Sequence, residues 1–367
     1  MSEAAVCNRQ GSGIEHLKHS CVVWIAELLP TVLGLAVGAI LTALLGLIFG
    51  INPSELFSVI KKAAFGSVFA LEDTLSRAGP LMLTGLAVVI PGRAGLIVLG
   101  GEASLVLGGL SVAVLSLGLT GVPPALAIFL LLVLASLMGA VLMGFVGGLR
   151  HLRGVNEVIS SLLLVYISIA LYNFLIEGIL RDPSSKNFPA TRPIPEQFQI
   201  GNIPGFDANW GLLAGFGACF VAQFLLSRTT YGFASRIVGG NPRAAQTLGL
   251  SVGFHIVFSC LICGALAGLA GGIEVLAVHG QASGALYHAS YGFTGVLVAF
   301  LARHHAVGVI PAAILIGGLG AAGGLVQRSF DLPGSFMLVV QGLVFVSILA
   351  AETLRDPIRA KIWRAKP

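Results

Sequence analysis

Long apolar runs separated by short polar stretches dominate this chain. About 20 apolar residues cross a bilayer as a helix, and helices are expected because lipid offers the backbone no hydrogen-bond partners. The second apolar run is short and ends at Pro91-Gly92, so we expect a broken helix there. Ten predicted spans follow, at residues 22–50, 80–92, 95–118, 123–148, 156–178, 208–227, 254–276, 286–302, 306–327 and 334–351.

The composition supports lipid as the solvent of this protein. Hydrophobic residues make up 56% of the chain and charged residues only 10%, whereas soluble domains carry about 25% charged residues. We therefore predict an all-α integral membrane protein with about ten transmembrane helices. The net charge of +5 does not indicate a nucleic-acid partner, because the basic residues are scattered over short loops.

The distribution of basic residues predicts the orientation. If the N-terminus is cytoplasmic, 14 of the 21 lysines and arginines fall on the cytoplasmic side, as the positive-inside rule requires. Both termini are then cytoplasmic. The predicted parts are a cytoplasmic tail at 1–21, a transmembrane domain at 22–351 with external loops at 51–79 and 179–207 and a cytoplasmic loop at 228–253, and a basic cytoplasmic tail at 352–367.

Small residues in the apolar runs predict close helix packing. Gly264, Gly268 and Gly272 repeat at intervals of four, which lets helix backbones approach closely. Cys260 and Cys263 have metal-ligand spacing, but no acid or histidine stands near them, so we interpret them as packing residues and expect no metal. A weak internal echo relates LTGLAVVIPGR (83–93) to FTGVLVAFLAR (293–303).

The cytoplasmic loop carries a predicted short helix. Asn241 is a good N-cap and Pro242 suits the first helical position, while Gly249 stands where the helix should end. A short helix held outside a membrane bundle could transmit force from a partner; alternatively, it is a capped surface helix without a partner. Its apolar face would comprise Ala244, Ala245 and Leu248.

Four motifs stand in order along the chain: PLMLTGLAVVIPGRAGLIVLGGEA (80–103), GVNEVISSLLLVYI (154–167), YGFASRIVGGNPRAAQTLG (231–249), and GALAGLAGGIEVLAVHG (264–280) with YGFTGVLVAFLAR (291–303) following. Together they resemble the branched-chain amino acid/ribose/nucleoside permease family of ABC importers, in its nucleoside-type branch.

The resemblance implies a type II importer-like permease bundle in the bacterial plasma (inner) membrane. It also implies four kinds of partner: a second permease subunit, most simply as a heterodimer, ABC ATPase subunits, an external solute-binding lipoprotein and membrane lipid. The residues matching the family's ATPase-coupling region are Arg236, Asn241, Pro242 and Arg243. The chain has no G-x-x-x-x-G-K-[ST] phosphate loop, so we expect no enzyme activity and no cofactor here, with ATP and Mg²⁺ on the partner ATPase.

Polar groups inside the apolar runs are candidates for the solute pathway. A charge near the middle of a membrane helix costs roughly 2.5–3.5 kcal/mol on insertion scales, so Glu102 and Glu274 need a reason to be there. Each could line the pathway, act as a buried hydrogen-bonding hub, or couple protons. The other candidates are Ser104, Asn156, Glu157, Tyr166, Asn173 and His279. For Asn156 and Glu157 the alternative is a helix N-cap and a first-turn acid near Arg150.

The chain departs from the family pattern at several pathway positions. Val98 and Val165 stand where the family has asparagines, Ala103 where it has glycine, and Ser104 where it has glutamine. A less polar path could suit a less polar solute. The function predicted is the permease subunit of an ATP-driven importer for nucleosides or a related solute; alternatives are a sugar or amino acid importer, or a proton-coupled secondary transporter. An intramembrane enzyme using His304-His305 finds little support, because no acid–histidine–nucleophile set is present.

Overall fold

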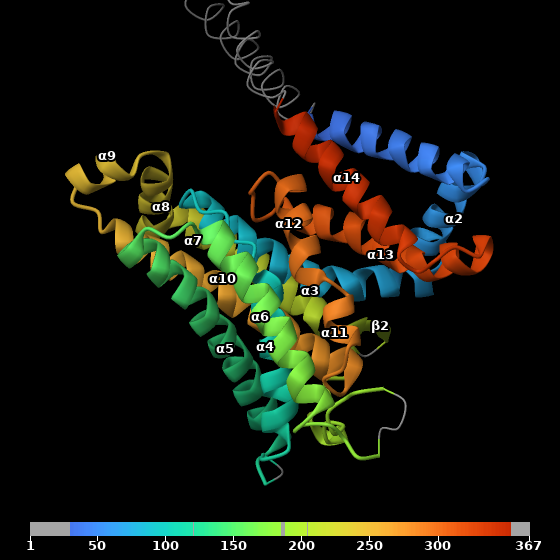
Figure 1. Cartoon of the computed structure of the whole chain (residues 1–367), viewed down its shortest axis with the longest axis horizontal. Helices are drawn as coiled ribbons and strands as arrows, with labels where there is room; N and C mark the ends of the chain where they lie inside the picture. The colour runs from blue at the N-terminus through green and yellow to red at the C-terminus, as the bar shows by residue number, and fades with distance from the viewer. Residues whose placement is uncertain (1–29, 120, 185–187, 204, 354–367) are drawn as a thin grey trace, which may run out of the picture. The chain divides into compact units, whose positions relative to one another are not determined.

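Helices account for almost all of the computed structural model, which describes residues 30–119, 121–184, 188–203 and 205–353 (Figure 1). Within these ranges, eight helices are long and apolar enough to span a membrane, and two shorter apolar helices cover Gly101–Ser116 and Ala285–Leu301. Together they fall on the ten predicted runs, which confirms the all-α membrane architecture. The predicted tail at 1–21, with Cys7 and Cys21, and residues 354–367 lie outside the described residues.

The elements follow one another with few loops. After a helix at Pro30–Ile48, they are α2 (Pro53–Phe65), α3 (Val68–Arg93), α4 (Gly101–Ser116), α5 (Pro124–Arg153), α6 (Glu157–Glu177), η1 (Glu196–Phe198), β1 (Asn202–Ile203), β2 (Phe206–Asn209), α7 (Gly211–Arg228), α8 (Thr230–Gly240), α9 (Pro242–Thr247), α10 (Val252–Glu274), the π-helical turn η2 (Val275–His279), α11 (Ala285–His288), α12 (Tyr291–Leu301), α13 (Val309–Phe330) and α14 (Phe336–Thr353).

The prediction of a short, broken second helix is wrong. Helix α3 runs without interruption for 26 residues, with Pro80 and Pro91 inside it and the Ser67 hydroxyl accepting a hydrogen bond from the Ala70 N–H at its start. Its first three turns carry acids and Arg77, which resemble a surface loop in the sequence. The predicted external loop at 51–79 is therefore mostly α2 and the beginning of α3.

The third predicted span is helical only from Gly101. Gly95 has φ +73°, a left-handed conformation that glycine adopts without steric cost, and it ends the course of α3. Residues 96–99 form no regular helix or strand, and their burial alternates as along a strand: Leu96 and Val98 are buried, while Ile97 is 50% exposed. We call residues 95–100 the extended segment.

The eighth predicted span, 286–302, is also interrupted. Helix α11 ends at His288, Ser290 takes the left-handed φ of +50°, and α12 begins at Tyr291. Both short apolar elements, α4 and α12, therefore begin after an irregular segment. Irregular backbone at membrane depth persists only where it is buried in protein or lines a cavity, and the first segment buries Leu96 and Val98 while it exposes Ile97.

Glycines let the helices of the larger compact unit, residues 59–325, pack backbone against backbone. Gly264 and Gly268 of α10 lie against the carbonyls of Gly139 and Ala135 in α5, and a Cβ added at Gly108 of α4 would lie 2.7 Å from the Gly268 Cα. The predicted small-residue ridge on α10 is thus a real contact surface. Cys260 and Cys263 are buried and free, as expected of packing residues.

The two echo segments pack on each other through α3 and α12. A Cβ added at Gly85 would lie 2.9 Å from the Val298 side chain, and one at Gly295 would lie 2.5 Å from Thr84. Gly92, further along α3, meets His304, further along the second segment. The contacts advance in the same direction along both chains, so the segments run parallel, as the sequence predicts.

Two other parts of the chain, the first apolar helix and the predicted loop at 179–207, are held by contacts with residues distant in the sequence. In the second compact unit, residues 1–58 and 326–367, the helix Pro30–Ile48 packs on α14, where a Cβ added at Gly34 would lie 2.9 Å from the Ile348 Cα. The predicted loop at 179–207 is held by hydrogen bonds, including one from the Thr191 N–H to the Ala282 carbonyl at 2.9 Å. It ends in an antiparallel pairing of β1 with β2.

Candidate functional site

Glu102 is buried at the start of α4 and finds its partner on another helix. The carboxylate is 1% exposed, and its Oε2 accepts a hydrogen bond from the backbone N–H of Gly292, in the first turn of α12, at 2.7 Å. A helix N-terminus has unpaired N–H groups and a partial positive charge, so it stabilises a carboxylate there. The structure thus ties together two short helices that are 190 residues apart in the chain.

Glu274 lies at the end of α10 and meets the same first turn of α12. It is 3% exposed, and it hydrogen-bonds with Tyr291, the residue before Gly292. The Nε2 atom of His279, at the end of the π-helical turn η2, lies 4.0 Å from the Glu274 Oε1. A π-helical turn of this kind is often found at functional sites.

The two predicted acids therefore converge on the first two residues of α12. Glu274 contacts the side chain of Tyr291, and Glu102 contacts the backbone of Gly292. The sequence predicts both acids as candidates, but it contains no signal that they share one helix terminus. Tyr291, Gly292 and the nearby Arg77, which interacts electrostatically with Glu274, were missed because their contacts are remote in the chain.

The remaining predicted pathway residues lie elsewhere. Ser104 is buried and donates from Oγ to the Gly139 carbonyl at 3.3 Å, which joins α4 to α5. Asn156 caps α6 by accepting hydrogen bonds from two backbone N–H groups, and Glu157 pairs with Arg150 at 3.2 Å. Further along α6, two more candidates are dispersed, one 71% exposed and one half-buried: Tyr166 and Asn173.

The predicted short helix after Asn241 is confirmed as α9. The Asn241 Oδ1 accepts hydrogen bonds from the Arg243 and Ala244 N–H groups at 3.0 and 3.2 Å, and Pro242 occupies the first turn. Ala245 is buried and Leu248 is 66% exposed, so the apolar face is partly free of contacts within this chain.

Helix α8 precedes α9 and contacts α7, α10 and the end of α3. Arg236 turns back and donates from Nη2 to the Leu226 carbonyl at 3.0 Å, at the end of α7. A Cβ added at Gly239 would lie 2.6 Å from the Arg93 carbonyl oxygen and 2.7 Å from the Gly95 nitrogen. The residue two positions before Asn241 therefore contacts the junction between α3 and the extended segment directly through backbone atoms.

The turn after α12 meets the same junction from the other side. Arg93 donates from Nε to the His304 carbonyl at 3.1 Å, and Arg303 and His304 both have positive φ. Burial, then the positive charge of Arg93 and the neighbouring His305, lower the pKa of His304 below its usual value. The neutral imidazole is the form that this position accommodates.

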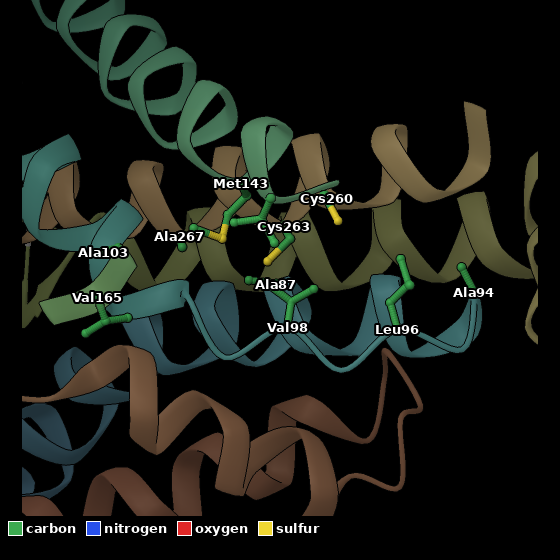
Figure 2. Close-up of a cluster of buried hydrophobic side chains, with 11 residues drawn as sticks. Ala87, Ala94, Leu96, Val98, Ala103, Met143, Val165, Cys260, Cys263 and Ala267 are labelled. Carbon is green, nitrogen blue, oxygen red and sulfur yellow. The ribbon is translucent and has the colours of Figure 1, made fainter. Parts of the chain in front are cut away.

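Val98 and Val165, where the resemblance leads us to expect asparagines, lie in one buried apolar cluster. The cluster also contains Cys260, Cys263 and Met143 (Figure 2). In Figure 2, Val98 lies beside Ala87 of α3. Both substitutions therefore belong to an apolar environment, where an unpaired amide would be costly.

A polytopic helical bundle with buried acids inside and a capped helix held outside has the organisation of a transporter's membrane subunit, and comparison with known proteins agrees. The family model described as the permease component of the branched-chain amino acid transport system matches residues 70–349. The chain therefore belongs to this family of ABC transporter permeases. It is a multi-pass protein of the bacterial inner membrane and, like its family, a non-enzymatic subunit.

Three relatives show the range of names within this similarity. The chain is 31% identical to the glucose ABC transporter permease protein TsgB13 of Haloferax volcanii, over 90% of this chain and 88% of the relative. It is 30% identical to the guanosine ABC transporter permease protein NupP of Bacillus subtilis, over 93% and 96%. It is 29% identical to the nucleoside ABC transporter permease protein NupB of Lactococcus lactis, over 88% and 90%.

Proposed function

We propose that this permease subunit carries nucleosides into the cell. Two of the three relatives described above are named for guanosine or nucleosides, and the motif resemblance favours the same branch. A sugar is the second candidate, since the third relative is named for glucose. Both are uncharged solutes rich in hydroxyl groups, which can hydrogen-bond with buried carboxylates such as Glu102 and Glu274.

The partners follow from the class of transporter. We propose a heterodimer with a second permease subunit, two cytoplasmic ATPases that bind ATP and Mg²⁺, and an external solute-binding lipoprotein. This chain would need no cofactor of its own. The capped, exposed helix α9 supports the proposal, because an N-capped surface helix with an exposed leucine offers a partner a rigid, partly apolar contact.

The observation that carries the mechanism is the contact between Gly239 and the Arg93–Gly95 junction. Movement of α9 on an ATPase would pass through α8 to the point where α3 ends and the extended segment begins. The extended segment leads to Glu102, and Glu102 holds the first turn of α12. ATP-driven movement would therefore reach the two buried acids through rigid, directly contacting elements.

We propose that the pathway runs past the first turn of α12. Glu102, Glu274 and His279 are the predicted residues that lie closest to this turn, and we expect them to contribute most to passage of the solute. Ser104, Tyr166 and Asn173 would contribute less, because the first joins two helices and the others lie along α6. Asn156 and Glu157 have local roles as a cap and an ion-pair partner.

The solute is tested with the complete transporter. The chain would be reconstituted in proteoliposomes with its second permease, its ATPases and its binding protein, and uptake of radiolabelled guanosine, adenosine and glucose would be measured with ATP inside or outside. We expect ATP-dependent uptake of the nucleosides and little uptake of glucose. Uptake of glucose without nucleosides would assign the sugar instead, and uptake without ATP would contradict the mechanism.

A further inference from the structure

A mixed cluster of charged and polar side chains surrounds Glu274. The sequence predicts Glu274 and His279 as candidates, but it does not indicate that the other residues gather around them. We call it the Arg77 cluster: Asp73 and Arg77 of α3, Glu274 of α10, His279 of η2 and Tyr291 of α12. Arg77 lies 16 residues before Arg93, so about 24 Å of helix at 1.5 Å per residue separates the cluster from the contact with α8. The cluster therefore lies towards the end of α3 that is remote from α8 and α9.

The exposure of the side chains in the cluster decreases from Asp73 and Arg77 to Glu274. The Arg77 Nε lies 3.2 Å from the Asp73 Oδ1, and these two side chains are 42% and 39% exposed. Arg77 also interacts electrostatically with Glu274 and Tyr291, whereas the Glu274 side chain is only 4% exposed. A half-exposed ion pair thus leads directly to a buried carboxylate.

The buried part of the cluster retains unused hydrogen-bonding capacity. Within the part of the chain that the structure describes, the buried Nε2 of His279 has no hydrogen-bond partner, and it lies 4.0 Å from Glu274. The Glu274 Oε2, on a far more buried side chain, likewise has no partner among the described residues. A buried polar atom without a partner costs free energy, so both atoms are available to hydrogen-bond with a solute. Intramembrane ionisable residues commonly mark solute pathways.

The chemistry of the cluster selects the kind of solute. Two carboxylates accompany a single guanidinium, which disfavours phosphates and other anions. Carboxylates accept hydrogen bonds from hydroxyl and N–H groups, and Arg77, Tyr291 and protonated or neutral His279 can donate them. The combination matches an uncharged solute with adjacent hydroxyl groups.

We propose that the Arg77 cluster is a solute-binding site that receives the ribose hydroxyls of the nucleoside, with Glu274 as the principal acceptor and Tyr291 as its partner. The half-exposed Asp73–Arg77 pair forms the mouth of this site. The inference rests on the proposed function and adds to it the residues that recognise the sugar.

The test compares two nucleosides that differ only in the hydroxyls at issue. Uptake of guanosine and of 2′,3′-dideoxyguanosine by the complete transporter would be measured for the wild type, Glu274→Gln, Tyr291→Phe and the exposed control Glu55→Gln. Loss of a hydrogen bond to a charged group weakens an interaction about tenfold or more. We expect guanosine uptake by Glu274→Gln to fall about tenfold or more, with Tyr291→Phe falling less, while dideoxyguanosine uptake changes less than about twofold.

Other outcomes would overturn the site. An equal loss for both nucleosides, in a complex with unchanged thermal stability and basal ATPase activity, would make the cluster a structural element only. Unchanged guanosine uptake in both variants would remove it from the pathway. If the wild type imports glucose and no nucleoside, the nucleoside assignment fails separately; glucose uptake would then be measured in the same variants, and its preservation would overturn the site.

Discussion

The carboxylate of Glu102 accepts a hydrogen bond from the backbone N–H of Gly292 at 2.7 Å, across 190 residues of chain. The two backbones also approach closely, because a Cβ added at Gly292 would lie 2.5 Å from the Glu102 Cα and 2.7 Å from its Oε2. The starts of α4 and α12 are thus joined by the Glu102 side chain, and the lack of a side chain at Gly292 lets their backbones approach closely.

We expect Gly292→Ala to disrupt this contact, whereas Gly101→Ala should be tolerated. At Gly292 the new methyl group would meet the backbone of Glu102, while at Gly101 the nearest atom would be 3.7 Å away, an ordinary contact. Overpacking of this kind costs about 1–3 kcal/mol. Thermal unfolding of the purified complex and ATP-dependent uptake measure both variants; equal behaviour of the two would contradict the contact.

Replacement of Glu102 by glutamine separates charge from shape. Glutamine keeps an oxygen that can accept from the Gly292 N–H, but it lacks the negative charge that the terminus of α12 favours. We expect Glu102→Gln to slow transport while the complex stays assembled, and Glu102→Ala to lower its stability as well. Uptake, together with co-purification of the ATPase, distinguishes the effects. Unchanged uptake by Glu102→Gln would show that the charge has no part in transport.

The contact between α8 and the α3 junction can be tested with adjacent glycines. A Cβ at Gly239 would lie 2.6 Å from the Arg93 carbonyl oxygen, whereas one at Gly240 would have nothing within 4 Å. We expect Gly239→Ala to reduce transport about tenfold, since strain of about 1.4 kcal/mol has that effect on a rate, and to leave ATP hydrolysis running. Gly240→Ala should behave as wild type. Tight coupling of hydrolysis to uptake in Gly239→Ala would contradict the proposed route.

The lowered pKa of His304 predicts a loss of stability on acidification. An unfolded histidine titrates near pH 6.5, and the folded protein holds the His304 pKa lower, so the unfolded state binds more protons in this range. The stabilising contribution is present above about pH 6.5 and is lost as the pH falls towards the folded-state pKa. Thermal unfolding between pH 8 and 5.5 should show this loss, and His304→Gln should flatten it. An unchanged slope in the variant would contradict the assignment.

Cysteine labelling tests the two faces of the extended segment. In a background with the five native cysteines replaced by alanine, Ile97→Cys should react with a membrane-impermeant thiol reagent and Val98→Cys should not. The reason is that Ile97 is 50% exposed and Val98 is fully buried. Reaction at position 98, or none at either position, would contradict the alternation.

Local chemistry made some parts of the structure predictable. Helix α9 follows from Asn241 and Pro242, whose capping geometry depends only on neighbouring residues. The apolar runs predict the spans because lipid acts on composition rather than on tertiary contacts. The capping and pairing of Asn156 and Glu157 agree with the simpler of the two interpretations given to them.

Other parts depend on contacts that the sequence does not display. The sequence places the start of α3 in an external segment because it carries several charges. In the structure these charges pair with each other and with residues of α10 and α12. The extended segment reads as a helix because it is uniformly apolar, yet Gly95 ends the helical course and the Leu99 N–H binds the Ser161 hydroxyl of α6. The partner of Glu102 is remote in the chain, and Glu274 meets the remote Arg77 and Tyr291 as well as the nearby His279.

The alternating faces of the extended segment also bear on how this type of importer can change during evolution. One face, with Leu96 and Val98, packs in the apolar core, while Ile97 between them is exposed and does not contribute to that core. A substitution at position 97 would alter the chemistry presented outward without repacking any helix. Residue exchanges at this position can therefore accumulate while the architecture of the protein is inherited intact.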